Sequence, residues 1–174
     1  MQKNYFQLFD LPETCELNID ALAVAYRELQ SEVHPDRFAT ASESEKLLAV
    51  QQSSYLNEAY STLKSPLKRA GYLLVQNNID IGKVDQNDLS MELLLEQIQL
   101  REMLDELPKD ASALADLESL KKDVQEKLHG RYQDFSDSTG KSNFPEAKII
   151  YHELQFLYKL LAEIESGEEQ RLEY

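Results

Sequence analysis

Apolar residues recur at helical spacing between Ile19 and Val33 and predict an amphipathic helix of about four turns. The apolar positions of this helix are Ile19, Leu22, Tyr26, Leu29 and Val33. Asn18 can cap its start, and Pro35 ends it, because proline cannot donate to a helix ladder and disfavours helical backbone at His34. A second helical pattern follows a short polar loop. The two helices are therefore expected to pack antiparallel, with the loop exposed at their tip.

Three further segments complete the N-terminal half. Residues Tyr5 to Phe9 form a short aromatic turn that is expected to pack on the helix pair. The partner helix runs from about Ser42 to Leu63, and a short fourth helix covers Leu67 to Val75 after a stop at Pro66. The apolar positions of the partner helix are Leu48, Val50, Leu56, Ala59, Tyr60 and Leu63.

Polar and turn-forming residues dominate from Gln76 to Asp88 and indicate a linker. Ile79, Ile81 and Val84 are embedded in it. A free linker needs no aliphatic side chains, so this one is expected to pack and to hold the two halves in one orientation. The predicted division is residues 1–75, a linker over 76–86, and residues 87–174.

The C-terminal part shows three amphipathic patterns with short connections, which predicts an antiparallel three-helix bundle and an all-α protein. The expected helices run from Asp88 or Ser90 to Leu107, from Asp110 or Ser112 to Phe135, and from Pro145 to Gly167, with a polar turn over 136–143. The seam of the last helix is Ala147, Ile150, Leu154, Leu157, Leu161 and Ile164, at the spacing typical of a bundle.

The first of these helices carries two apolar clusters rather than one. At about 100° per residue, one side gathers Leu93, Leu100, Met103, Leu104 and Leu107. The nearly opposite side gathers Met91, Leu94, Leu95 and Ile98. A bundle helix buries only one face, so the other cluster either packs on the rest of the chain or forms an exposed binding patch. Periodicity does not decide between these alternatives.

Composition narrows the class of partner. The net charge of −14 and the pI near 4.6 disfavour nucleic acids and anionic membranes. The single cysteine, Cys15, indicates a reducing compartment, and no stretch is typical of a signal peptide, a presequence or a membrane span. The cytoplasm is the expected location. His129 and His152 are isolated, and without paired ligand spacing we expect neither a metal site nor a cofactor.

Several motifs together resemble the J-domain of DnaJ-type co-chaperones. They are Tyr5-Phe6 and Leu8-Phe9, then His34-Pro35-Asp36, then Asn57, Ala59, Tyr60 and Leu63. The strings HPDRF and PLKRAGYLL, with the acidic helical C-terminal half, resemble the HscB family, the specialised J-proteins of iron–sulfur cluster assembly. This resemblance covers essentially the whole chain.

The resemblance implies that the loop docks on a DnaK/HscA-type ATPase chaperone and stimulates its ATP hydrolysis. Asp36 would offer a carboxylate to a basic group of that partner, Pro35 would fix the backbone, and His34 would hydrogen-bond locally. Arg27 and Arg37 are the accompanying cations. J-domains usually present a basic second helix, whereas this one also carries Glu28 and Glu32, so electrostatic steering is expected to be weak.

The resemblance also implies a binding face for the iron–sulfur scaffold protein IscU. Its residues would be Leu94, Leu95, Ile98, Gln99, Glu102 and Phe156. Gln99 stands where the family often has an acid, and Arg101 and Asp105 would lie at the polar rim. Cys15 alone cannot hold a cluster, so the protein would escort the scaffold rather than carry iron.

Two other classes of function remain open. A passive helical adaptor with a degenerate J-domain would bind a partner without changing its ATP turnover. A metal hydrolase using His34 and Asp36 would be an enzyme, whereas neither the co-chaperone nor the adaptor would be.

Overall fold

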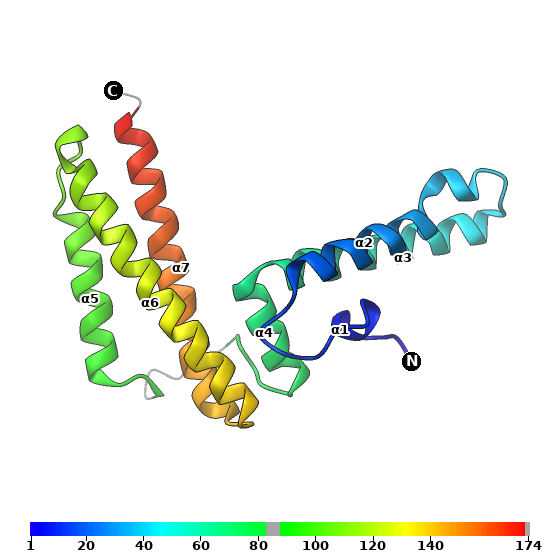
Figure 1. Cartoon of the computed structure of the whole chain (residues 1–174), viewed down its shortest axis with the longest axis horizontal. Helices are drawn as coiled ribbons and strands as arrows, with labels where there is room; N and C mark the ends of the chain where they lie inside the picture. Colours follow the sequence, from blue (N-terminus) through cyan, green and yellow to red (C-terminus); the bar gives the residue numbers. More distant parts are fainter. Residues whose placement is uncertain (83–87, 173–174) are drawn as a thin grey trace. The chain divides into compact units, whose positions relative to one another are not determined.

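A computed structural model describes residues 1–82 and 88–172, and these form helices and connecting turns without any strand. The chain divides into two compact units, Met1–Leu73 and Leu74–Tyr174 (Figure 1). The predicted all-α class is confirmed. The packed linker stays a prediction, because Val84 lies outside the described residues.

The N-terminal unit is built on a pair of antiparallel helices. They are α2 (Ile19–Val33) and α3 (Glu43–Lys64), joined by the short 3-10 helix η1 (Pro35–Phe38) (Figure 1). The short helix α1 (Tyr5–Leu8) packs against α3, and α4 (Pro66–Gln76) follows α3 directly. The helix pair predicted from apolar spacing is therefore present.

Tyrosine contacts fix α1 in place. The ring of Tyr5 stacks on Tyr72 of α4 with centroids 4.3 Å apart, and the backbone N–H of Tyr5 donates to the Tyr72 hydroxyl at 3.0 Å. Tyr55 of α3 packs edge-on against Tyr5 at 5.4 Å. Burial, together with the nearby carboxylate of Glu58, raises the pKa of Tyr5 to about 12. These rings seal Phe6 into the core.

The apolar set predicted for α3 is partly wrong. Leu56, Ala59 and Leu63 are buried as expected, but Leu48 and Val50 are 54% and 58% exposed. Near the loop, Ala49 is the buried residue of α3 instead. The short helix η1 also packs against α3.

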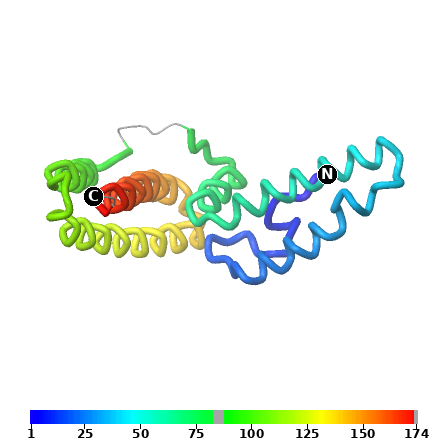
Figure 2. The backbone as a smooth tube through the Cα atoms, turned by 90° about the horizontal axis from the view of Figure 1, so that it is seen from above, coloured from blue at the N-terminus to red at the C-terminus, as the bar shows by residue number. Residues whose placement is uncertain are grey.

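The C-terminal unit is a three-helix bundle of α5 (Met91–Asp105), α6 (Leu114–Gly140) and α7 (Phe144–Leu172). A single 3-10 turn, η3 (Ala111–Ala113), leads into α6. Figures 1 and 2 show that α5 and α7 run in the same direction and α6 in the opposite one. The core between α6 and α7 is continuous, whereas α5 packs on this pair less extensively.

Both long helices extend beyond their predicted ends. The polar turn expected over 136–143 is wrong, because α6 continues to Gly140 and buries Phe135 and Ser138. Gly167 was expected to stop α7, which instead continues to Leu172. In the predicted seam, Leu161 is only half-buried and the neighbouring Leu160 is buried.

Arg171 explains why α7 continues past Gly167. Its guanidinium is buried, donating from Nη1 to the carbonyl of Gly167 at 2.8 Å and from Nε to that of Pro108 at 3.0 Å. A Cβ on residue 167 would lie 2.9 Å from Arg171 Nη1, so glycine here makes room for the guanidinium. The last turn of α7 is thus tied to the α5–α6 connection.

We expect Arg171→Ala to lower the free energy of unfolding by about 2 kcal/mol, because it leaves the Pro108 carbonyl without these donors. Urea unfolding followed by circular dichroism measures this. Gln170→Ala, an exposed neighbour in the same turn, is the matched control and should leave the midpoint unchanged. Equal midpoints for the two variants would contradict this role of Arg171.

Candidate protein-binding surfaces

The first surface is the loop between α2 and α3. His34 takes extended backbone angles, φ −60° and ψ 136°, as the residue before a proline should. Its Nδ1 accepts the backbone N–H of Asp36 at 3.3 Å, and its carbonyl accepts the N–H of Arg37 at 3.0 Å. The Asp36 side chain is 91% exposed. The loop is therefore locally ordered while its carboxylate projects into solvent.

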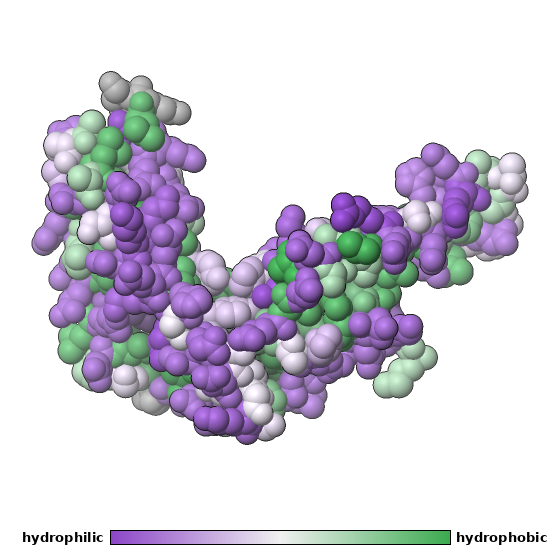
Figure 3. Space-filling model, viewed as in Figure 1, coloured by the Kyte–Doolittle hydropathy of each residue, from purple (hydrophilic) through white to green (hydrophobic). Residues whose placement is uncertain are grey.

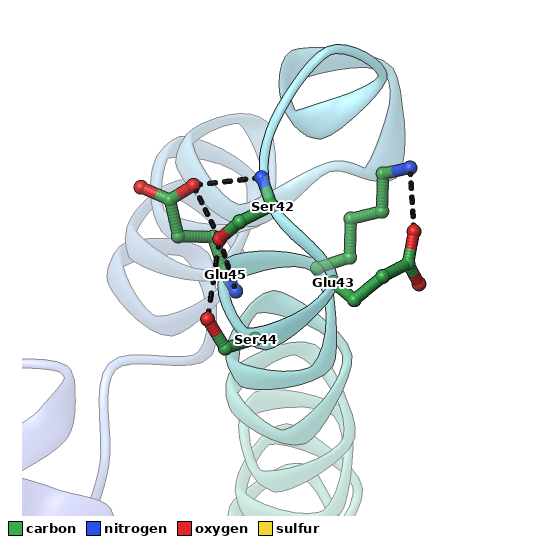
Figure 4. A network of polar contacts seen from close by, with 5 residues as sticks. Ser42, Glu43, Ser44 and Glu45 are labelled. Carbon is green, nitrogen blue, oxygen red and sulfur yellow. Dashed lines mark hydrogen bonds and ion pairs between the residues drawn. The ribbon is translucent and has the colours of Figure 1, made fainter.

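A capping box at Ser42 begins helix α3 just after this loop (Figure 4). The backbone N–H of Ser42 donates to Glu45 Oε2 at 2.9 Å, and the N–H of Glu45 donates to Ser42 Oγ at 3.3 Å. These hydrogen bonds, the one from the Ser42 backbone first, hold the pKa of Glu45 below its ordinary value. The predicted start of the partner helix is confirmed.

Polar contacts join α2 and α3 beside the loop. Tyr26 stacks on Tyr60 at 4.0 Å, and its hydroxyl donates to Asn57 Oδ1 at 2.7 Å. Gln30 Nε2 donates to the Tyr26 hydroxyl at 3.0 Å. A shallow groove next to this network is lined by Gln30, Ser31, His34, Pro35 and Ser53. This groove side of the hairpin is held rigid up to the loop.

The basic and acidic side chains of α2 lie on different edges of the helix. At about 100° per residue, Arg27 lies on the same side of α2 as Gln30 and Ser31, next to the groove. Glu28 and Glu32 fall on the other edge. Arg37 is exposed within η1. The two glutamates that weaken the basic character of α2 therefore do not line the groove.

The second surface is the outer face of α5. Met91, Leu95 and Ile98 are 71%, 51% and 53% exposed, and Leu94 is half-buried. Figure 3 shows apolar patches interrupting the hydrophilic surface along this helix. Leu100 and Leu104 form the buried face. Within the C-terminal unit, Met91, Leu95 and Ile98 of this cluster are therefore exposed.

Met103 was predicted on the buried side of α5, and this is wrong. Its side chain is 51% exposed and lines a groove toward α6 together with Leu95, Gln99 and Asp123. Because α5 packs loosely on α6, the buried stripe is narrower than the apolar cluster in the sequence suggests.

Phe156 and Leu94 lie at the same level of the bundle. The helices α5 and α7 are parallel, and a bidentate pair joins Arg101 to Glu163, with Arg101 Nη2 donating to Glu163 Oε1 at 3.2 Å. About two turns earlier on each helix stand Leu94 and Phe156. The hydrogen bond from Arg101 also lowers the pKa of Glu163.

The other predicted residues of this face divide between its two sides. Ile98 and Glu102 are exposed on the outer face, whereas Gln99 is turned toward the α6 groove. Phe156 is half-buried and helps to line a cavity of about 630 Å³ between α5 and the α6–α7 pair. Phe156 therefore stands on the α7 side of α5 at the level of Leu94, whereas Gln99 lies on the α6 side.

Sequence analysis missed a buried ion pair in that cavity. Arg131 Nε donates to Glu153 Oε2 at 2.6 Å, and the Glu153 side chain is only 7% exposed. This hydrogen bond raises the pKa of Arg131. A glutamate on a bundle seam gives no sequence signal of burial unless its arginine partner, on another helix, is known.

The described residues hold neither a metal-binding cluster nor a membrane-spanning helix. Among the residues that the structure describes, no group of three or more His, Cys, Asp or Glu side chains is placed to hold a metal ion. Over the same residues, every helix is too short or too polar to cross a bilayer.

Comparison with known proteins gives consistent matches. The family model described as the HSCB C-terminal oligomerisation domain matches residues 89–165. A co-chaperone protein HscB homolog of Vibrio vulnificus strain YJ016 is 38% identical over 167 residues, covering 96% of this chain and 98% of the relative.

Solved structures agree over nearly the whole chain. Chaperone HscB from Vibrio cholerae matches with a TM-score of 0.86 and 38% identity, covering 97% of this chain and 99% of that one. Human co-chaperone HscB matches with a TM-score of 0.87 and 27% identity, covering 95% and 82%. The resemblance inferred from the loop and the PLKRAGYLL string is confirmed: the chain belongs to the HscB family, the co-chaperones of iron–sulfur cluster assembly.

Proposed function

We propose that the protein stimulates a DnaK/HscA-type ATPase chaperone through residues 1–75 and delivers to it an IscU-type scaffold protein held by residues 87–174. The observation that carries this proposal is the Asp36 carboxylate, 91% exposed on an ordered loop, in a co-chaperone that also exposes an apolar helix face. Since the HscB family is not enzymatic, the hydrolase alternative falls away.

In this proposal the loop acts by docking. Asp36 accepts a charge-assisted hydrogen bond from a basic group of the chaperone, and Pro35 together with the His34 contacts fixes the direction of the carboxylate. Arg27 and Arg37 flank it as secondary contacts. The chemistry of ATP hydrolysis belongs entirely to the chaperone, so the loop changes its rate by favouring one of its conformations.

The scaffold is held by apolar burial. Leu94, Leu95 and Ile98 form the centre of the face, with Phe156 beside Leu94 and the polar groups of Gln99 and Glu102 at the rim. Each aliphatic side chain that becomes fully buried contributes about 2 kcal/mol. Holding the scaffold and the chaperone on one chain raises their effective concentration for each other. We place this activity in the cytoplasm, where a bacterial cell keeps the ATP that the chaperone consumes.

We predict that Asp36→Ala abolishes stimulation of the chaperone's steady-state ATPase while leaving scaffold binding intact, because only the projecting carboxylate is lost. Glu32→Gln, which removes a charge from the opposite edge of α2, is the control and should stimulate like the parent. If Asp36→Ala stimulates fully, the loop assignment is wrong; a parent protein that binds both partners without stimulating would instead be a passive adaptor.

We predict that the double substitution Leu94→Ala and Phe156→Ala weakens scaffold binding while leaving stimulation of the chaperone intact. Affinity for the scaffold should fall about 100-fold in isothermal titration calorimetry, since two apolar contacts at one level of the face are truncated. Stimulation of the chaperone without scaffold should be unchanged. Met103→Ala, at an exposed residue on the other edge of α5, should bind normally. A double variant that binds as tightly as Met103→Ala would place the scaffold elsewhere.

A further inference from the structure

Exposed aliphatic side chains stand on α3 just after the loop. Leu47 and Val50 are 59% and 58% exposed, although they belong to the first turns of a helix whose later turns are well buried. We name these two residues the α3 ridge. Solvent-exposed aliphatic residues that adjoin each other beside a functional loop indicate a contact surface.

The ridge lies on the groove side of the hairpin. Val50 precedes Asn57 by about two turns and so shares its edge, and Asn57 Oδ1 accepts the Tyr26 hydroxyl of α2 at 2.7 Å. Leu47 precedes Val50 by one turn, toward the outer face. Ser53, which lines the groove with His34 and Pro35, follows Val50 by one turn. Val50 is therefore one turn from the groove lining, and Leu47 stands one turn nearer the loop end of α3.

Leu48 has similar exposure but a different position. It precedes Tyr55 by about two turns, and Tyr55 packs edge-on against Tyr5 of α1 at 5.4 Å. Leu48 therefore stands on the α1 edge of α3, away from the groove. Its side chain is 54% exposed. This provides a matched control within the same helix.

The charges nearest the ridge are few and of mixed sign: Arg27 lies next to the groove on α2, and Glu43 and Lys46 precede the ridge on α3. The groove residues Gln30, Ser31 and Ser53 are uncharged, and Glu28 and Glu32 fall on the far edge of α2. Lys46, one turn before Val50, is paired with Glu43 at 3.3 Å. Exposed charges are screened beyond about 8 Å at physiological ionic strength, whereas burial of aliphatic surface is not weakened by salt.

We propose that the α3 ridge docks in an apolar recess of the same ATPase chaperone that the loop engages, so that recruitment depends on aliphatic burial more than on ion pairs. This inference rests on the proposed function and adds the chemistry of the contact. The chaperone is the occupant because Val50 lies one turn from Ser53, which lines the groove together with His34 and Pro35. Asp36 then triggers hydrolysis in a complex that the ridge has helped to form.

The test compares the concentration of this protein that gives half-maximal stimulation of an HscA-type chaperone at low and high salt. We expect Leu47→Ala with Val50→Ala to raise that concentration at least about tenfold at both salt levels. Stimulation at saturation should equal that of the parent, since Asp36 is intact. Leu48→Ala should behave as the parent, and the parent should change less than about threefold with salt.

Other results would contradict the inference, the proposed function, or both. If the parent stimulates and loses stimulation with Asp36→Ala, but the ridge variant has the parent's half-maximal concentration, the inference is wrong and the proposed function stands. The inference is also wrong if salt weakens the parent tenfold, or if the ridge variant loses only scaffold affinity or self-association. A parent that never stimulates removes the proposed function and the ridge inference together.

Discussion

A proline sets the geometry on which the N-terminal unit depends. Because Pro35 cannot continue a helix ladder and holds His34 in extended backbone, α2 ends at Val33 and the chain turns through η1. The hydrogen bonds around His34 and the capping box at Ser42 then close the turn from both sides. The backbone of Asp36 is thereby held in place, while its carboxylate stays exposed to solvent.

In the C-terminal unit, α5 packs on the other two helices although much of its apolar surface is exposed to solvent. Leu100 and Leu104 give it one narrow buried stripe, and two edge pairs assist: Arg101 with Glu163 of α7, and Lys127 of α6 with Glu96. These pairs are partly exposed and each contributes modestly. Their placement at the two edges keeps α5 from rotating its outer leucines inward. An apolar face can therefore remain available at the cost of a less tightly packed helix.

Local rules predicted most helices correctly, and tertiary partners account for the failures. The period of apolar residues and the Asn18 cap placed α2 correctly, and Ser42 with Glu45 placed the start of α3. Periodicity gives the direction of a side chain but not what lies opposite it, so Val50 and Met103 were assigned to faces that have no cover. Glycine often ends a helix, so Gly167 predicted a stop. Because Gly167 has no Cβ, the Arg171 guanidinium has room to donate to the carbonyls of Gly167 and Pro108, and α7 continues. For the candidate site, spacing found both clusters of α5, and only coordinates could show which was exposed.

The overall charge makes these exposed apolar faces tolerable. At a net charge of −14, copies of the chain repel one another on close approach, which opposes non-specific association. This repulsion decays within about 8 Å in physiological salt. It disfavours the approach of other acidic surfaces but does not increase the affinity of a complex once it has formed. Affinity must then come from short-range burial at the faces themselves. The groove residues Gln30, Ser31 and Ser53 are uncharged and the outer face of α5 is largely aliphatic, so in the proposed complexes apolar contact would supply most of the affinity.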